Sequence, residues 1–360
     1  MNRIVSTYLS KMLVALMPVV FMISCTPSDR YVTFSGYAQG GTYTVKINMN
    51  GRDGMVGMHP QQIKDSVDAI LTRIDMSLSG YNRKSILSRF NSGETVVPDS
   101  IFIDCYSKAH MIYSLTEGVV DAASAPLFDM WGFGFKSGEM PDEARVRKVL
   151  SECGMCRLAP DMRQAAGPDG SLSAADLLTD ENEALPLLNY NAIAQGYSCD
   201  LVAEFLYSIG VKDMMVDIGE IFCDGVNPSG QQWGIGIDRP EDGNNELGAK
   251  LQAIFRVPSG PHGVVTSGNY RKFYVREGKK YSHTIDPRTG YPVSHNLLSA
   301  TIVTRDALMA DAYATYCMVI GLEASKAFIE SSPELEGCLI YDDDGEFRTW
   351  TSSGMTLSEL

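Results

Sequence analysis

Apolar residues recur at the spacing of one helical face in several segments of the chain. In residues 61–76, Ile63, Val67, Leu71 and Ile74 fall three or four positions apart. Residues with this spacing lie on one side of a helix, so the segment is predicted to be amphipathic, with that side buried. Similar patterns predict further helices over residues 101–116, 194–209, 306–320 and 323–331.

Strands are predicted where apolar residues alternate with polar ones or form short runs. In residues 41–49, Tyr43, Val45 and Ile47 occupy every second position, as one face of a half-buried strand requires. Short β-like runs follow at 214–218, 233–237, 263–268, 271–276, 297–303 and 337–342. Strands and helices are mixed without regular alternation, which predicts an α+β fold with a largely antiparallel sheet.

Two polar segments interrupt this pattern. Residues 159–183 and 240–250 are rich in small and charged residues. We expect both to be surface excursions and not domain linkers, because apolar patterning resumes directly after each. The expected organisation is therefore one compact domain over residues 36–355.

The N-terminal segment has a different character. Residues 12–24 are mostly apolar, are broken by Pro18, and follow a stretch with Arg3 and Lys11 but no acid. The run is too short for a comfortable membrane span and is typical of a secretory signal. Cys25 directly after a small residue resembles a bacterial lipoprotein signal, with residues 1–24 removed, Cys25 lipidated and residues 25–35 as a tether. An uncleaved anchor and a plain secretory signal are the alternatives.

Charge narrows the choice of partners. The 360-residue chain has a formal net charge of −14, and loss of Arg3 and Lys11 with the signal would take it to −16. This charge argues against nucleic-acid binding, and no cluster of Lys and Arg contradicts it. An acidic chain that binds phosphates needs a metal ion or backbone N–H groups to do so.

The eight cysteines do not form a disulfide scaffold in so large a chain. Cys153 and Cys156 make the one CxxC motif, and no second motif or nearby histidine completes a zinc site. We interpret the pair as structural or incidental, with a local disulfide as one possibility.

Three features carry candidate chemistry, although each has an ordinary structural interpretation. Asp311 and Thr315 are four residues apart, so one helix face would present two oxygens of the kind that Mg²⁺ binds. The helix expected from residue 194, which Asn191 could cap, would offer N–H groups to an anion. His283 is one of five histidines and a natural base near neutral pH. In isolation, a helix-dipole Asp, a core helix and a structural histidine are the more common explanations of these three features.

Taken together, eight blocks in order resemble the ApbE family of FAD:protein FMN transferases. The blocks are QGGTYTV (39–45), GYNRKSILSRFN (80–91), VVDAASAPLFDMWGFG (119–134), NAIAQGYSCD (191–200), VDIGEIF (216–222), VVTSGNYRKF (264–273), HTIDPRTGYPV (283–293) and ADAYAT (310–315). They span nearly all of the chain after the signal. The resemblance implies T-fold-like units in a single compact α+β domain.

The resemblance also implies an activity. Such an enzyme binds FAD with Mg²⁺ and transfers FMN to a Ser or Thr hydroxyl of an acceptor protein, releasing AMP. The family's acceptors include subunits of membrane redox complexes. An enzyme of this kind would be lipid-anchored in the bacterial cell envelope, facing the periplasm or the exterior.

Individual roles follow from the matched positions. The implied flavin contacts are Gln39, Tyr81, Val119, Val120, Asp121, Asn189, Gln195, Ser267, Gly268 and Ile285, with Tyr81 stacking on the isoalloxazine. The implied metal ligands are Asp311, Thr315 and the backbone carbonyls of Ala192 and Ala314. His283 corresponds to the family's essential histidine and would be the base.

The chain departs from the family pattern at several of these positions. Gln195 stands where lysine is usual, Asn189 where aspartate is usual, and Gln39 where methionine is usual. The acid and the cation are lost together, which is compatible with activity and leaves FAD affinity open. A metal-dependent FAD pyrophosphatase and a non-catalytic flavin-binding lipoprotein remain the alternative hypotheses.

Overall fold

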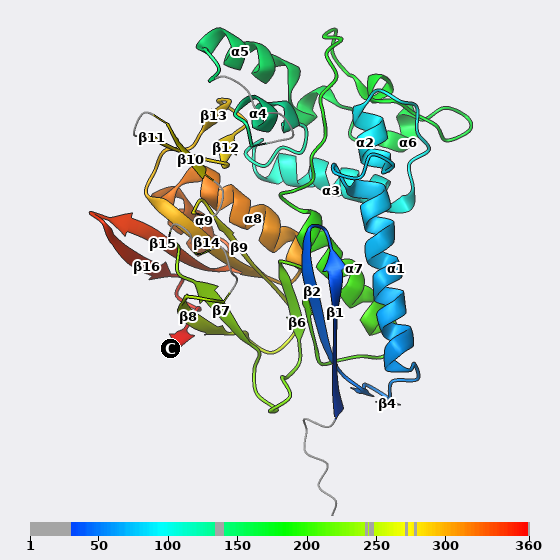
Figure 1. Ribbon diagram of the computed structural model, residues 1–360, viewed down its shortest axis with the longest axis vertical. Coiled ribbons are helices and arrows are strands. Elements are labelled where there is room, and N and C mark those ends of the chain that lie inside the picture. Colours follow the sequence, from blue (N-terminus) through cyan, green and yellow to red (C-terminus); the bar gives the residue numbers. More distant parts are fainter. Residues whose placement is uncertain are drawn as a thin grey trace, which may run out of the picture.

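The fold is built around one eight-stranded antiparallel sheet (Figure 1). The computed structural model describes residues 30–133, 140–241, 244, 248–270, 273–276 and 279–358. The strands of the sheet are, in spatial order, β1 (Tyr31–Ala38), β2 (Gly41–Asn48), β5 (Met214–Asp217), β6 (Ile221–Asp224), β9 (His262–Gly268), β14 (Leu297–Thr304), β15 (Glu336–Asp343) and β16 (Glu346–Thr351). Every neighbouring pair is antiparallel, which confirms the predicted α+β class.

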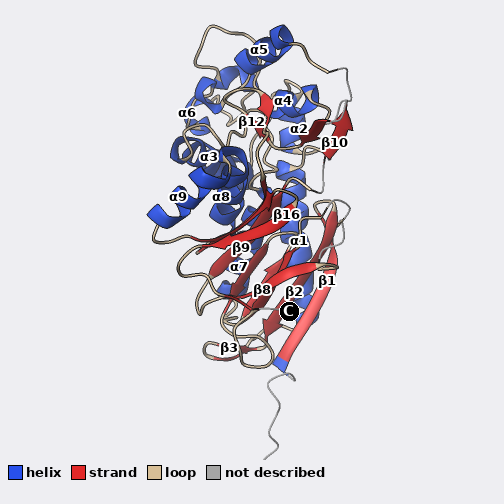
Figure 2. Ribbon diagram, turned by 90° about the vertical axis from the view of Figure 1, so that its left-hand side faces the viewer, coloured by secondary structure: helices blue, strands red, loops and turns tan. Residues whose placement is uncertain are grey.

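Helices cover one face of this sheet and a small second sheet covers the other (Figure 2). The long helices are α1 (Pro60–Leu78), α3 (Ser100–Leu115), α7 (Ala194–Ser208), α8 (Ala307–Ile320) and α9 (Leu322–Ser331). The second sheet contains β7 (Gly234–Asp238), β8 (Leu251–Arg256) and β17 (Leu357–Ser358). Along β9, Val265 packs toward α8 while its neighbour Val264 packs toward the second sheet. This alternation is what a strand buried on both faces requires.

Shorter elements form the end of the molecule above the helices (Figure 1). They are α2 (Ile86–Asn91), α4 (Ala125–Met130), α5 (Glu143–Glu152), α6 (Met162–Ala165), the 3₁₀ turns at Met155–Arg157 and Ala174–Leu177, and the hairpins β10 (Phe273–Arg276) with β11 (Lys279–Ser282) and β12 (Ile285–Asp286) with β13 (Tyr291–Pro292). A further hairpin, β3 (Asn50–Gly51) with β4 (Gly54–Met55), lies at the opposite end.

Residues 159–183 are not the simple surface excursion that their composition predicted. Met162, Leu172 and Leu177 are almost fully buried in the main core. Bridges from Val96 to Leu172 and from Leu158 to Leu178 hold the segment against the body of the protein. Most of its apolar residues are alanines and the few large ones are irregularly placed, so the sequence shows no periodicity although the packing is real. Of the second predicted excursion, 240–250, only part lies within the described residues.

The predicted tether of residues 25–35 is also too long. β1 begins at Tyr31 and pairs with β2 along its whole length. Val32, Phe34 and Ala38 pack against the core, so this part of the chain belongs to the fold. The expected signal peptide and Cys25 lie outside the described residues. No helix in the described part of the chain is long and apolar enough to span a membrane.

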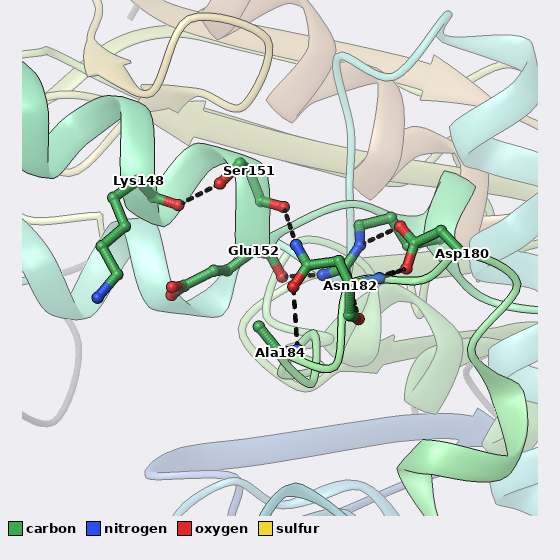
Figure 3. A network of polar contacts seen from close by, with 7 residues as sticks. Lys148, Ser151, Glu152, Asp180, Asn182 and Ala184 are labelled. Carbon is green, nitrogen blue, oxygen red and sulfur yellow. Dashed lines mark hydrogen bonds and ion pairs between the residues drawn. The ribbon is translucent and has the colours of Figure 1, made fainter.

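Polar contacts join the end of α5 to the loop at residues 180–184, where Ser151, Asp180 and Asn182 lie close together (Figure 3). Arg157, only 6% exposed, donates to the carboxylate of Asp180 at 2.6 Å and to the carbonyls of Glu152 and Asn182 at 2.7 and 2.6 Å. The Asn182 side chain in turn donates to the Ser151 carbonyl at 3.0 Å. Because a buried guanidinium must have its donors satisfied, these contacts fix residues 180–184 against the end of α5.

The contact of α7 with α8 leaves no room for a side chain at Gly196. A Cβ atom there would meet the Ala307 carbonyl oxygen at 2.2 Å and the Asp311 Cβ at 2.9 Å. We expect Gly196→Ala to lower the free energy of unfolding by about 1–3 kcal/mol, measured by chemical denaturation, because two packed backbones must separate. Gly57→Ala, whose Cβ would meet open space, is the matched control. Equal stability of the two variants would contradict this account of the packing.

Candidate functional site

The first turn of α7 is joined to α8 by a hydrogen bond. Gly196 is the third residue of α7, so its amide has no acceptor within the helix. It donates to Asp311 Oδ2 at 3.1 Å, across the helix contact. Ala192 precedes the helix, so the hydrogen-bond ladder of α7 does not use its carbonyl.

These groups fit a Mg²⁺ ion. Asp311 is 4% exposed, and Thr315 follows it by one turn on the same face of α8. A carboxylate, a hydroxyl and a backbone carbonyl are hard oxygen donors, and a single carboxylate leaves positions for phosphate oxygens and water. The Ala314 carbonyl fits less well, because it lies inside α8, where a regular helix uses each carbonyl. The described residues contain no cluster of three His, Cys, Asp or Glu side chains suited to a metal.

The electrostatics of Asp311 favour a bound cation. Burial raises the pKa of its carboxyl, and the negative charge of Asp200 raises it further, whereas the Gly196 amide lowers it. A charged carboxylate without water around it is costly unless an opposite charge approaches. A cation at this position would supply that charge.

Asp200 is a residue whose role the sequence analysis missed. Its two carboxylate oxygens accept from the amides of Ala307 and Leu308 at 2.8 and 2.9 Å. Asp306 accepts from the Met309 amide in the ordinary N-cap position. The start of α8 is thus held by one acid of its own and one acid from α7. Asp200 is the last residue of the block at 191–200, and the sequence analysis used it only as part of the family resemblance.

Two glutamines connect neighbouring loops to the start of α7. Gln39 lies in the β1–β2 turn with a φ of 51°, and its side-chain amide donates to the Ser198 hydroxyl. Gln195 donates from Nε2 to the Ile218 carbonyl at 3.0 Å. A Cβ atom on Gly219 would approach this Nε2 to 2.3 Å, so the glycine makes room for the amide. At both departures from the family pattern, an uncharged amide crosslinks the loops.

The loop at 119–124 lies beside the segment that precedes α7. The backbone N–H of Asn189 donates to the Ala122 carbonyl at 2.7 Å. Val119 and Val120 are buried, and Asp121 accepts from the amide of Ala123 at 2.8 Å. These residues therefore form a rigid wall, and their side chains largely stabilise the loop itself.

Asn191 does not cap α7 as predicted. The cap position belongs to Ile193, which has no side-chain acceptor, and α7 begins at Ala194. The backbone N–H of Asn191 donates to Asn189 Oδ1 at 2.8 Å, so Asn191 belongs to a turn that precedes the cap position by two residues.

His283 lies between β11 and β12, partly buried beside the ring of Phe133 at a centroid distance of 6.4 Å. Ile285 is 3% exposed and packs with Leu127 and Trp131, so only its backbone could contact a ligand. Trp131 Nε1 donates to the Gly290 carbonyl at 2.8 Å, which fixes the following turn. These contacts fix the backbone that follows His283.

The remaining predicted residues are Ser267 and Gly268 on β9 and Tyr81 after α1. Ser267 and Gly268 end β9, and a Cβ on Gly268 would approach the Tyr270 ring to 2.5 Å. Tyr81 is 73% exposed on the turn after α1, as stacking on a planar ligand requires. Hydrogen bonds bring together residues 39, 195–198, 218 and 311, whereas Tyr81 and His283 lie on separate segments. Cys153 and Cys156 are free thiols, so the local disulfide is not formed.

The sheet, its helical cover and the oxygen donors at the α7–α8 contact define an α+β protein with a candidate site for a metal-bound diphosphate. The model of the ApbE family matches residues 39–339, and the chain belongs to this family. It is 30% identical over 345 residues to the FAD:protein FMN transferase of Vibrio cholerae, covering 95% of this chain and 96% of that one. The Escherichia coli K12 protein of the same description is 29% identical over 308 residues, covering 83% and 82%.

Solved structures agree. The flavin transferase ApbE from Vibrio cholerae superposes with a TM-score of 0.71 at 29% identity, covering 90% of this chain and 97% of that one. The apo form of the flavinyl transferase ApbE from Pseudomonas stutzeri gives 0.71 at 28% identity, covering 90% and 95%. The predicted family and fold class are confirmed.

Asp121 is expected to make the stability of the folded protein depend on pH. Burial raises the pKa of its carboxyl to about 6, although the Ala123 and Met155 amides oppose the shift. The folded state then retains a proton that the unfolded chain loses near pH 4, so this stabilisation is lost as the pH rises through 6. We expect the melting temperature of wild type to fall relative to Asp121→Asn between pH 4 and 6. A difference that does not change over this interval would contradict the prediction.

Proposed function

We propose that this protein is an FAD:protein FMN transferase that uses Mg²⁺. It transfers FMN from FAD to a Ser or Thr hydroxyl of an acceptor protein and releases AMP. The observation that carries the proposal is the oxygen site where α7 meets α8, in a chain whose curated relatives are named for this reaction. Mg²⁺ held by Asp311, Thr315 and the Ala192 carbonyl would offset negative charge on the diphosphate of FAD.

The reaction exchanges one bond to phosphorus for another. The acceptor hydroxyl oxygen bonds to the phosphorus of the FMN half, and the bond from that phosphorus to the bridging oxygen breaks. AMP leaves with the bridging oxygen, and the hydroxyl proton passes to a base. A neutral hydroxyl is a weak nucleophile, so a positioned base accelerates this step. His283, beside Phe133, is the residue we assign to it.

We assign flavin binding to the predicted contact residues on the neighbouring loops and strand end. Tyr81 offers an exposed ring for stacking, and Val119, Val120 and Asp121 form a fixed loop. Gln195 and Asn189 are uncharged, so cofactor recognition here depends on hydrogen bonds, backbone N–H groups and the metal. Ser267 and Gly268 supply the hydroxyl and close backbone approach of a strand end.

We also propose that the enzyme is a lipoprotein of the bacterial cell envelope. The support is the sequence alone: an apolar signal followed by Cys25. Three acyl chains on Cys25 would exceed the two lipid signals that stable anchoring needs. Acceptors that are subunits of membrane redox complexes would then share the same surface.

Transfer is tested by incubating the protein with FAD, Mg²⁺ and an acceptor, then measuring the acceptor's mass. We expect the acceptor to gain one FMN, and His283→Ala to lower the rate by about 10²–10⁴-fold with little change in FAD affinity, because a base acts only in the chemical step. His262→Ala, a histidine at the start of β9, is the matched control.

The same assay separates the alternatives. In Asp311→Ala, activity should respond far more weakly to added Mg²⁺. Release of free FMN whether or not an acceptor is present would replace the proposal with an FAD pyrophosphatase. Wild-type transfer rates in His283→Ala would remove this histidine from catalysis.

Lipidation is tested by cell fractionation and intact mass. Cys25→Ser should move the protein from the membrane to the soluble fraction and abolish the added lipid mass. Transfer to a soluble acceptor should stay at the wild-type rate, because Cys25 precedes the fold. An unlipidated wild-type protein would exclude the lipoprotein assignment.

A further inference from the structure

Strand β1 is an open edge of the main sheet. Among the described elements it pairs only with β2, over eight residues without a shift in register. Its sequence, YVTFSGYA, contains no charged residue and no proline. Edge strands of this length usually carry charges, prolines or bulges, because their unpaired backbone groups otherwise recruit other strands.

The opposite edge shows the usual protection. β16 carries Glu346 and Arg348, both exposed, and Arg348 also lies 3.5 Å from Asp343 on the neighbouring strand. The two edges belong to the same sheet and face the same solvent. The lack of protection on β1 is therefore a local property that needs its own explanation.

The open backbone groups of β1 can be assigned from its hairpin. The two-residue turn at Gln39 and Gly40 is closed by the pair Ala38 and Gly41, which in such hairpins is hydrogen-bonded. Because the pattern alternates, the N–H and C=O groups of Thr33, Ser35 and Tyr37 point away from β2. The side chains of these three residues are exposed, with Tyr37 at 74%.

This edge leads directly to the candidate site. β1 ends at Ala38, and the next residue, Gln39, donates from its side chain to Ser198 in the second turn of α7. Gln195 and Gly196, one turn earlier, carry the contacts to Ile218 and Asp311. A strand added along β1 would therefore end beside the groups assigned to the diphosphate.

We propose that the β1 edge is the docking site of the acceptor protein, which adds an extended segment as a ninth strand. This inference rests on the proposed transferase function, because that reaction needs a protein hydroxyl brought to the site on an accessible length of chain. Pairing through Thr33, Ser35 and Tyr37 recognises backbone groups, which every acceptor has. The exposed Tyr37 ring, nearest the site, contacts side chains of the added strand.

The test removes one open N–H group and blocks the edge. Ser35→Pro leaves the β1–β2 hydrogen bonds in place, because the lost N–H points outward. We expect the KM for the acceptor protein to rise about ten-fold or more, as loss of one or two backbone hydrogen bonds implies. The dissociation constant of FAD should stay at the wild-type value.

Two variants serve as controls. Ser35→Ala removes the 3.2 Å contact with Thr44 but keeps the N–H, and should behave as wild type. Thr349→Pro makes the same change at an outward position of β16, since the Asp343–Glu346 pair closes that hairpin. It should leave the acceptor KM unchanged.

The outcomes are separable. An unchanged acceptor KM in a folded Ser35→Pro protein would overturn the docking site, whereas absence of transfer by wild type would overturn the proposed function instead. A dimer that Ser35→Pro dissociates without changing acceptor kinetics would assign the edge to a second copy of the chain. If Ser35→Pro does not fold, Thr33→Lys with Tyr37→Lys places charges on the same edge and must raise the acceptor KM.

Discussion

The hydrogen bond from the Gly196 amide to Asp311 is the interaction on which the site depends. It requires α7 and α8 to approach until any side chain at Gly196 would strike the backbone at Ala307. The same contact holds the Asp311 carboxylate away from water, directly after a segment whose Ala192 carbonyl precedes the helix. One close helix contact therefore creates a buried negative charge that a cation would neutralise.

The other loops of the site are positioned relative to this contact by neutral groups. The side chains of Gln39 and Gln195 reach from a hairpin and from α7 to partners on other elements, and the backbone N–H of Asn189 fixes the loop at Ala122. The side-chain amides of Gln39 and Gln195 connect these elements without placing a charge near a bound diphosphate. In a chain of net charge −14, a bound metal ion would then be the principal source of positive charge at the site.

Periodicity predicted the helices well, because a helix that buries one face must repeat its apolar residues every turn. It failed where burial depends on isolated residues, as at Leu172 and Leu177, or where a strand is half exposed. β1 was missed although Val32, Phe34 and Ala38 alternate with polar residues. The family blocks pointed to the residues of the site, but the approach at Gly196 and the two amides held by Asp200 depend on distances between segments that no local pattern contains.

β1 would also determine from which end a lipid anchor holds the molecule. The chain enters the fold at Tyr31, and eight residues of strand, about 26 Å, separate this point from the turn at Gln39 (Figure 1). α7 spans about 22 Å between the same two ends. With a lipid on Cys25, the length of the fold itself would separate the bilayer from the candidate site, which would face away from the membrane. Such an enzyme would select acceptors partly by the height of their hydroxyl above the membrane.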